Sequence, residues 1–121
     1  MLGSPRKPVR WVGSARGDLR RFPKPVRIAI GVALNSAQLG GKHSKAKPLR
    51  GFHGSSVVEI VEDFDGDTYR GVYTVRFAGV LYVLHCFQKK SRKGIETARS
   101  DIDLVRIRLR LAEQDFKLTT E

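Results

Sequence analysis

Three strand-forming runs follow one another between residues 56 and 89, and they constrain the fold more than any other part of the chain. They are Ser56–Asp63, Thr68–Phe77 and Val80–Lys89. Asp65-Gly66-Asp67 separates the first two runs and Ala78-Gly79 the last two, and both are typical turn sequences. The pattern predicts an antiparallel meander. Its last strand runs directly into a cluster of positive charge formed by Lys89, Lys90, Arg92 and Lys93.

Two other segments have the periodicity of amphipathic helices. From Pro25 the apolar residues recur at helical spacing through Ala37, and Gly40-Gly41 follows as a stop signal. Gly31 in this segment costs a helix about 1 kcal/mol relative to alanine. The segment Asp101–Phe116 alternates like a strand in places, but its apolar residues also repeat at helical spacing, and Ser100-x-x-Asp103 resembles a capping box. We predict a helix for both segments.

Shorter elements are expected in the rest of the N-terminal half. Residues 1–8 contain two prolines and two bases, and we expect a flexible basic tail there, followed by a single domain over residues 9–121. The run Val9–Val12 predicts a short strand, and Ser14 can cap a brief helix that ends at Arg21. Residues 42–54 are basic and contain Pro and Gly, so we predict a loop.

The charge of the chain is high and unevenly distributed. Lys and Arg total 23 against 12 Asp and Glu, which gives a net charge of +11. Residues 1–50 hold 12 of the bases and a single acid, Asp18, whereas residues 51–121 hold 11 of each sign. Such a surplus is typical of proteins that bind nucleic acid, although a basic surface also suits an acidic protein partner.

The sequence offers little for metal, disulfide or membrane chemistry. Cys86 is the one cysteine, so no disulfide forms within the chain, and its place in a strand favours an inert packed thiol. The three histidines are scattered without ligand spacing, and we expect no metal and no other cofactor. No apolar run is long enough to span a bilayer, and the first residues lack the apolar core of a signal peptide. We expect a cytosolic protein.

The order of elements and three stretches of sequence carry a resemblance to a known family. They are Tyr69-Arg70 in the first hairpin, the run LYVLHCFQKKSRKGIET that begins at Leu81, and the helical start DIDLVRIRL at Asp101. Over residues 8–116 the chain resembles the RelE/ParE-superfamily toxins of bacterial type II toxin–antitoxin systems, and within them the phage-derived, HigB-like branch. The most specific part of the likeness is Leu84-His85-Cys86-Phe87-Gln88-Lys89-Lys90.

The resemblance implies an α+β fold, with a small twisted antiparallel sheet, two N-terminal helices and one C-terminal helix. It implies a toxin that cuts mRNA on the ribosome and is neutralised by an antitoxin, expected to be a helix-turn-helix protein. RelE-type toxins carry catalytic lysines on the first meander strand, where this chain reads Val58-Glu59-Ile60-Val61. Relatives of the HigB-like branch read Thr-Pro where this chain has Thr97-Ala98.

Four residues are the candidates for catalysis. Metal-free RNA cleavage needs a base for the 2′-OH, cations for the charge that develops on phosphorus, and an acid for the leaving oxygen. Arg70 and Lys89 are assigned to charge stabilisation, because strand positions fix them. Lys90 points to the opposite face of an ideal strand and serves only if the strand has ended. An imidazole is the side chain ordinarily suited to exchange protons near neutrality, which makes His85 a candidate, but in the run VLHCF it also fits a packed core residue.

Lys47, Arg50, Arg92 and Lys93 are the candidate RNA-binding residues, because cations there would contact backbone phosphates without sequence preference. Two other functions remain open. ParE-type relatives poison DNA gyrase by binding, without catalysis, and a decayed relative would only bind RNA or a partner. The cations at Arg70 and Lys89 favour the nuclease, since protein docking does not require them.

Overall fold

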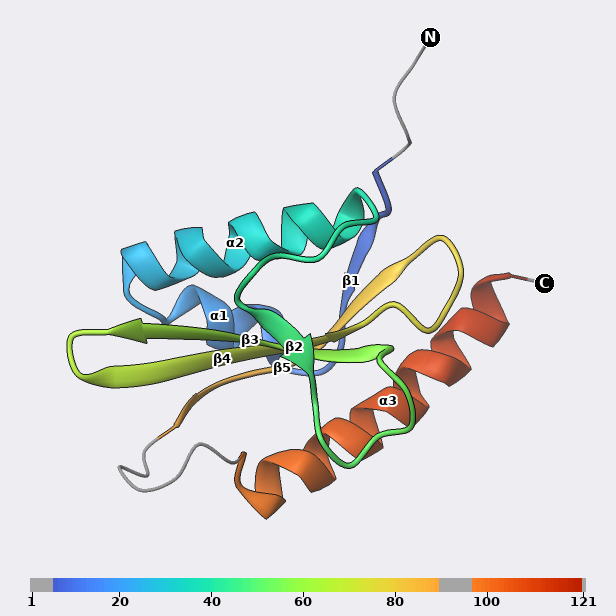
Figure 1. Cartoon of the computed structure of the whole chain (residues 1–121). Helices are drawn as coiled ribbons and strands as arrows, with labels where there is room; N and C mark the ends of the chain where they lie inside the picture. The colour runs from blue at the N-terminus through green and yellow to red at the C-terminus, as the bar shows by residue number, and fades with distance from the viewer. Residues whose placement is uncertain (1–5, 90–96, 121) are drawn as a thin grey trace, which may run out of the picture.

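The computed structural model of the chain describes residues 6–89 and 97–120. Five strands and three helices follow in the order β1, α1, α2, β2, β3, β4, β5, α3 (Figure 1). The strands are β1 (Val9–Trp11), β2 (Ala46–Pro48), β3 (Val57–Phe64), β4 (Asp67–Thr74) and β5 (Leu81–Lys89). The helices are α1 (Ala15–Arg20), α2 (Lys24–Gln38) and α3 (Arg99–Thr119). The predicted meander, the three predicted helices and the α+β class are therefore confirmed.

The five strands form one sheet in the order β1-β5-β4-β3-β2. Strands β2 to β5 pair antiparallel, whereas β1 runs parallel to β5, with Val9 opposite Leu81. The sheet is thus mixed, whereas the sequence analysis predicted an antiparallel sheet. A parallel edge strand is possible because α1, α2 and strands β2 to β4 lie between β1 and β5, a connection long enough for β5 to run in the direction of β1.

The prediction of a loop over residues 42–54 is wrong at its centre, where Ala46–Pro48 forms strand β2 against β3. Proline is tolerated there because β2 is an edge strand and its second edge needs no ladder donor. The predicted second strand is also too long, because β4 ends at Thr74. The Thr74 hydroxyl donates to the Ser56 carbonyl and accepts the Arg76 backbone N–H, which turns the chain out of the sheet.

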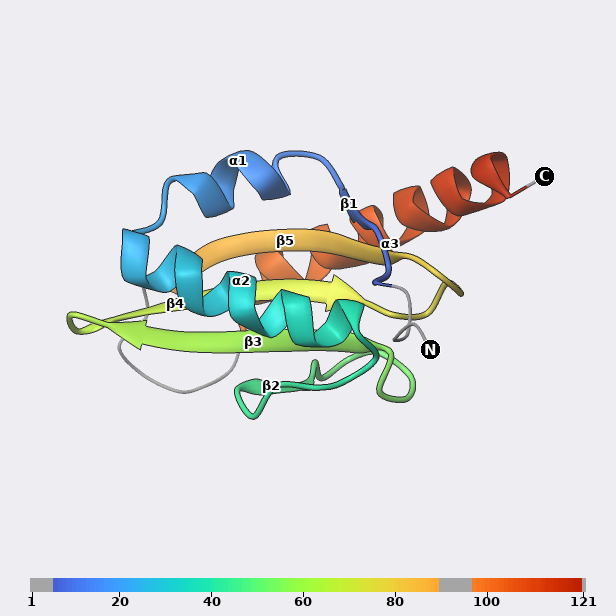
Figure 2. The same cartoon turned by 90° about the horizontal axis from the view of Figure 1, so that it is seen from above.

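The sheet separates two hydrophobic layers. Helices α1 and α2 cover one face, and α3 covers the other (Figures 1 and 2). On the first face, Val26 and Ile30 of α2 pack against Ile60, Tyr69 and other strand residues. On the second face, Val105 and Ala112 of α3 pack against strand residues that point the other way. These are Val57, Val72, Tyr82, Leu84 and Phe87. Alternation along each strand therefore assigns every side chain to one of two environments.

A bulge interrupts the ladder between β4 and β5. Val72 lies opposite His85 and Tyr73 opposite Val83, so Leu84 is the extra residue. The Leu84 carbonyl accepts a hydrogen bond from Arg108 Nη1 at 2.9 Å, and the same guanidinium donates to the Ser14 hydroxyl. Gly13 leaves room for this arginine, since a Cβ there would stand 2.9 Å from Arg108 Nε. Arg108 thus fastens α3 to both the sheet and the start of α1.

The start of α3 and the N-terminal segment differ from what the sequence predicts. Ala98 stands at the N-cap of α3 and no side chain caps it, so the capping box expected at Ser100 and Asp103 does not form. Of the expected N-terminal tail, residues 1–5 lie outside the described residues, while Lys7 exchanges two hydrogen bonds with Gln38. Among residues 6–89 and 97–120, no helix is both long and apolar enough to cross a membrane.

Candidate active site

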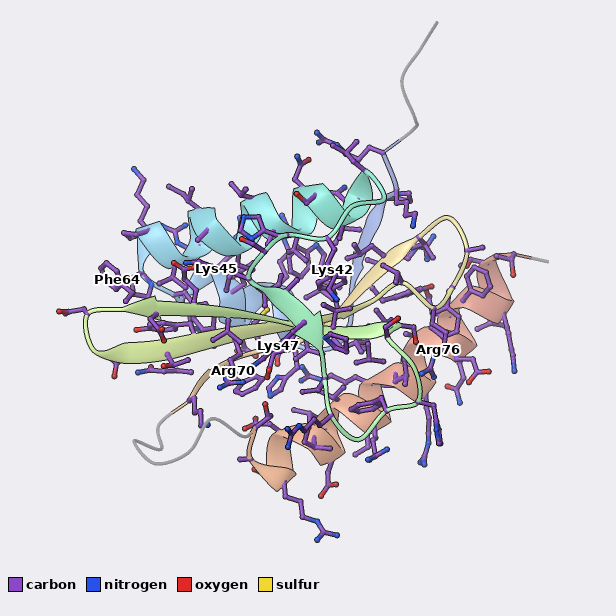
Figure 3. The ribbon with its side chains drawn as sticks, in the orientation of Figure 1. Lys42, Lys45, Lys47, Phe64, Arg70 and Arg76 are labelled. Atoms are coloured by element: carbon purple, nitrogen blue, oxygen red, sulfur yellow. The ribbon has the colours of Figure 1, made fainter. Side chains whose placement is uncertain are left out.

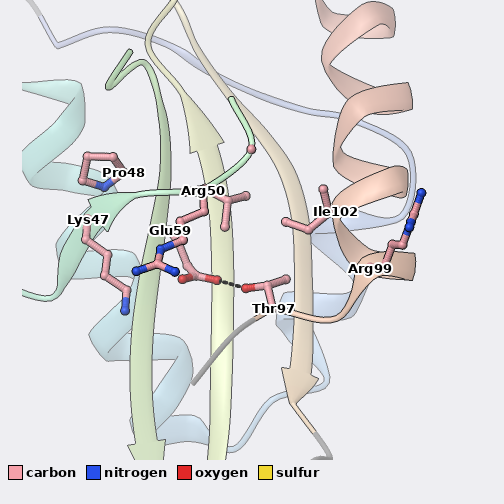
Figure 4. Close-up of a pocket in the computed structure, with 9 residues that line it drawn as sticks. Lys47, Pro48, Arg50, Glu59, Thr97, Arg99 and Ile102 are labelled. Atoms are coloured by element: carbon pink, nitrogen blue, oxygen red, sulfur yellow. Dashed lines mark hydrogen bonds between the residues drawn. The ribbon is translucent and has the colours of Figure 1, made fainter. Parts of the chain in front are cut away.

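A pocket of about 610 Å³ opens on the α3 side of the sheet, between β2, β3 and the first turn of α3 (Figure 4). Strand β2 and the residues after it contribute Lys47 and Arg50, and β3 contributes Glu59. The opposite wall comes from Thr97, Arg99 and Ile102. The pocket therefore joins segments that are up to 55 residues apart, from Lys47 to Ile102.

A buried ion pair forms the polar base of this site. Arg70 Nη1 lies 2.7 Å from Glu59 Oε1, and the two side chains are 4% and 3% exposed. The Thr97 hydroxyl donates to Glu59 Oε2 at 2.5 Å and lies 3.4 Å from Arg70 Nη1. Glu59 and Arg70 meet because they are diagonal neighbours in the β3–β4 ladder, with Glu59 opposite Val72 and Arg70 opposite Val61. Glu59 thus accepts bonds from a guanidinium and from a hydroxyl.

Two exposed cations stand over this carboxylate. Lys47 lies directly opposite Glu59 in the β2–β3 ladder, so both side chains leave the same face of the sheet. In Figure 4 the Arg50 guanidinium points toward Glu59 and the Lys47 side chain runs alongside it, whereas the Arg99 guanidinium points away. The first meander strand, β3, contains no lysine, but the adjacent edge strand β2 places Lys47 directly opposite Glu59.

The approach to the pocket is also basic. Lys42 and Lys45 precede β2 and lie with Lys47 along one edge of the sheet (Figure 3). Lys45 forms an ion pair with Glu62 at 2.6 Å, while Lys42 and Lys47 are exposed. Lysines on an edge strand discourage pairing with a second sheet, and here they also raise the positive potential beside the pocket.

His85 lies on the same face but does not line the pocket. Its Nε2 is 2.7 Å from Asp101 Oδ1, and its ring stacks on Phe87 with 4.5 Å between centroids. The imidazole is 9% exposed. Through Asp101, His85 holds the first turn of α3 against β5, next to the place where Thr97 holds it against β3 and β4.

The structure brings together some of the residues selected from the sequence and leaves others outside the described residues. Lys47 and Arg50 line the pocket, and Arg70 lies directly behind Glu59. Lys89 ends β5 opposite Thr68 and, by strand alternation, shares the face of Phe87 and Arg70. Lys90, Arg92 and Lys93 fall within residues 90–96, which the structure does not describe.

On the α3 side of the site, the polar residues Thr97, Arg99 and Asp101 were not selected from the sequence. Each depends on how the start of α3 docks, which the local sequence does not reveal. The pairing of Glu59 with Arg70 had a usable signal. Glu59 lies between Val58 and Ile60, and Arg70 between Tyr69 and Gly71, so each is a charge among uncharged neighbours, and a turn at Asp65-Gly66 makes them diagonal neighbours.

Two other titratable side chains of the sheet, Cys86 and Tyr82, remain protonated at neutral pH. Burial raises the pKa of Cys86 to about 12, so its thiol carries almost no thiolate at neutral pH. Burial and a hydrogen bond to Asp115 raise the pKa of Tyr82 to about 12. Within the described part of the chain, no three His, Cys, Asp or Glu side chains gather closely enough to hold a metal ion.

Comparison with known proteins gives the family. Residues 17–110 match the model of the family described as Phage derived protein Gp49-like (DUF891). Among curated proteins, no sequence matches the chain significantly. A solved structure to which the chain is similar is the RelBE2 toxin–antitoxin complex from Mycobacterium tuberculosis, at 20% identity and a TM-score of 0.45, covering 69% of this chain and 99% of that one. The family match spans most of the chain, which therefore belongs to the Gp49-like phage-derived family, a RelE-type family of toxins from toxin–antitoxin systems.

Proposed function

We propose that this toxin is an endoribonuclease that cleaves mRNA on the ribosome, in the cytoplasm, without a metal ion. One observation carries the proposal. Lys47 and Arg50 line one pocket with Glu59, a carboxylate that already accepts a hydrogen bond from a hydroxyl group. A 2′-OH that is about to attack phosphorus must donate its proton in the same way.

The chemistry needs only the RNA and side chains of the protein. The 2′-oxygen forms a bond to the adjacent phosphorus while the bond from phosphorus to the 5′-oxygen breaks. Glu59 accepts the proton of the 2′-OH. A protonated side chain of the site donates a proton to the departing 5′-oxygen. The products are a 2′,3′-cyclic phosphate and a 5′-hydroxyl. No water or cofactor is consumed in this step.

Cations have the second role. In the phosphorane the nonbridging oxygens gain negative charge, which the ammonium of Lys47 and the guanidinium of Arg50 offset. Arg70 lies behind Glu59, where its ion pair with the carboxylate at 2.7 Å orients this side chain. We further assign Lys89 and Lys90 to charge stabilisation and Arg92 and Lys93 to the RNA backbone. His85 acts by fixing Asp101 and the first turn of α3.

The test is cleavage of a short mRNA bound to ribosomes by the purified protein, with the 5′ ends mapped. The double variant Lys47→Ala with Arg50→Ala should cut at least about a hundredfold more slowly, the usual effect of losing a preorganised charge-stabilising group. Arg110→Ala with Lys117→Ala removes two exposed bases from α3 and should cut at the wild-type rate.

The same preparation decides against the proposal in two ways. Intact mRNA with wild-type protein, together with DNA breaks when gyrase is added, would identify a gyrase poison. Equal cleavage by the wild type and the Lys47 and Arg50 double variant would place the nuclease site elsewhere. The proposed mechanism also requires a 2′,3′-cyclic phosphate at the new 3′ ends. This product should form both in the presence and in the absence of a metal chelator.

A further inference from the structure

Helix α2 exposes an apolar stripe on the side that faces away from the sheet. Ile28 and Val32 of the helix and Leu39 at its C-cap are 57%, 52% and 51% exposed. Their spacing of four and seven residues places them on one side of the helix. The buried residues of α2, such as Val26 and Ile30, already fill the layer against the sheet. The stripe is therefore a second apolar face, beyond the one that the fold uses.

A glycine lies within this exposed face. Gly31 is exposed in the middle of α2, and among residues 6–89 and 97–120, apart from its chain neighbours and the backbone of its own helix, no atom comes within 4 Å of the position that a Cβ would occupy. Its cost to the helix is thus not offset by close packing inside this molecule. Glycine is favoured where a second backbone approaches closely, and the open space above Gly31 allows such an approach.

The charge around the stripe has one sign. Lys24 and Arg27 are exposed on α2, and the helix contains no acid. The single acid of the first fifty residues, Asp18, is bound by the Ser14 hydroxyl and by Arg21. Helix α3 also exposes Ile107, Leu111 and Leu118, but acids as well as bases flank them, among them Asp103 and Glu113.

We propose that the stripe on α2 is the docking surface for an acidic amphipathic helix of the antitoxin. Apolar residues of that helix would cover Ile28, Val32 and Leu39, its backbone would approach Gly31, and its carboxylates would face Lys24 and Arg27. The proposal rests on the toxin family and not on RNA cleavage. Because α2 and the pocket lie on opposite faces of the sheet, a helix docked on α2 leaves the pocket open.

The probes are two synthetic helical peptides of 18 residues that share one leucine stripe, flanked by Glu in the first and by Lys in the second. Each is titrated into the 121-residue protein, with affinity measured by calorimetry and the contact mapped by amide chemical shifts. The Glu peptide should bind and shift residues 28–39. The double variant Ile28→Glu with Val32→Glu should weaken it about tenfold or more, the effect of losing one or more buried apolar contacts.

Gly31→Ala separates docking from folding. An alanine at an exposed helical position should raise the melting temperature of the free protein, yet its methyl group should weaken binding of the Glu peptide. A variant that merely damaged the helix would lower both quantities. The matched control is Ile107→Glu with Leu111→Glu on α3, which should leave the affinity unchanged.

Three results would overturn the proposal. The first is absence of saturable binding of the Glu peptide, and the second is equal binding of both peptides or shifts that map to α3. The third is a dimer of the unliganded protein in light scattering that Val32→Glu dissociates, because the stripe would then serve a second copy of the chain. None of these measurements uses RNA, so failure of the nuclease proposal leaves the test intact.

Discussion

The pairing of Glu59 with Arg70 has an energetic consequence that differs from that of an exposed pair. Both side chains are almost fully buried, so Glu59→Leu takes from the Arg70 guanidinium the carboxylate that lies 2.7 Å away and offsets the cost of its burial. Glu59→Leu should lower the free energy of unfolding by about 3–5 kcal/mol. The double variant Glu59→Leu with Arg70→Met should be more stable than Glu59→Leu alone. Urea unfolding followed by the fluorescence of Trp11, the one tryptophan, measures both.

Glu113→Gln is the control for this cycle. Glu113 pairs with Lys117 on the exposed side of α3 at 3.4 Å, and its replacement should change the stability by less than about 1 kcal/mol. Equal losses from the buried and the exposed pair, or additive losses in the Glu59 and Arg70 double variant, would contradict the reading of a desolvated ion pair. The cycle also shows why Arg70 variants are poor tests of catalysis, since their fold is weakened at the same time.

Asp115 gives a prediction about pH. The Tyr82 hydroxyl donates to Asp115 at 2.7 Å and Arg10 at 2.9 Å, and these bonds lower the pKa of the carboxyl below its ordinary value of 3.8. A carboxyl with a lowered pKa contributes stability above its unfolded value and loses it as the pH falls through the folded value. The stability difference between wild type and Asp115→Asn should therefore be constant near neutral pH and shrink below about pH 4.

Tyr82→Phe supplies the matched comparison, because it removes the first of the two bonds and keeps the ring between Phe77 and the sheet. In this variant the Asp115 resonance, followed by carboxyl NMR, should titrate closer to 3.8 than in the wild type. An unchanged titration would mean that Arg10 alone sets the ionisation of this carboxyl.

At the scale of the elements, Arg108 connects three of them. It satisfies the carbonyl of Leu84, the extra residue of the bulge in β5, and it reaches Ser14 ahead of α1. Arg108→Met keeps the length of the side chain but leaves a buried carbonyl without a donor, which should cost about 1–3 kcal/mol of stability. Thermal unfolding measures it, with Arg110→Met as the exposed control on the same helix.

Gly13→Ala tests the same connection from the other side. Gly13 has a φ of +56°, and a methyl group there would meet the Arg108 guanidinium at 2.9 Å. The change should therefore destabilise the protein, and less so in the Arg108→Met background than in the wild type. Equal losses in both backgrounds would assign the effect to backbone strain alone.

The elements that the sequence predicted are those whose information is local. Helix α2 and the meander follow from periodicity and turn chemistry, and both were confirmed. Strand β2 was missed because three residues containing Lys47 and Pro48 carry no strand pattern of their own and depend on the edge of β3. The parallel pairing of β1 was missed for the same reason, since it is set by β5, about 70 residues later in the chain.

At the scale of the whole molecule, the sheet divides the two kinds of basic surface. Lys47 and Arg50 lie with the pocket on the α3 side, whereas Lys24 and Arg27 lie on α2, across the sheet. The sequence predicted the surplus of charge in the first fifty residues and named Lys47, Arg50 and Arg70. It could not predict that Thr97 and Asp101 complete the site, because their place depends on the docking of α3 over the sheet.

This division predicts how salt affects RNA binding. A single-stranded oligonucleotide bound in the pocket releases counterions, so the logarithm of its affinity should fall linearly with the logarithm of salt concentration. Lys47→Ala with Arg50→Ala removes two phosphate contacts and should reduce the slope by about 1.4, at about 0.7 per contact. Lys24→Ala with Arg27→Ala removes the same net charge from the other face and should leave the slope as it is. Fluorescence anisotropy over a salt series measures all three proteins. If both double variants reduced the slope equally, RNA would respond to net charge and not to the pocket, because only a localised contact distinguishes two variants of identical total charge.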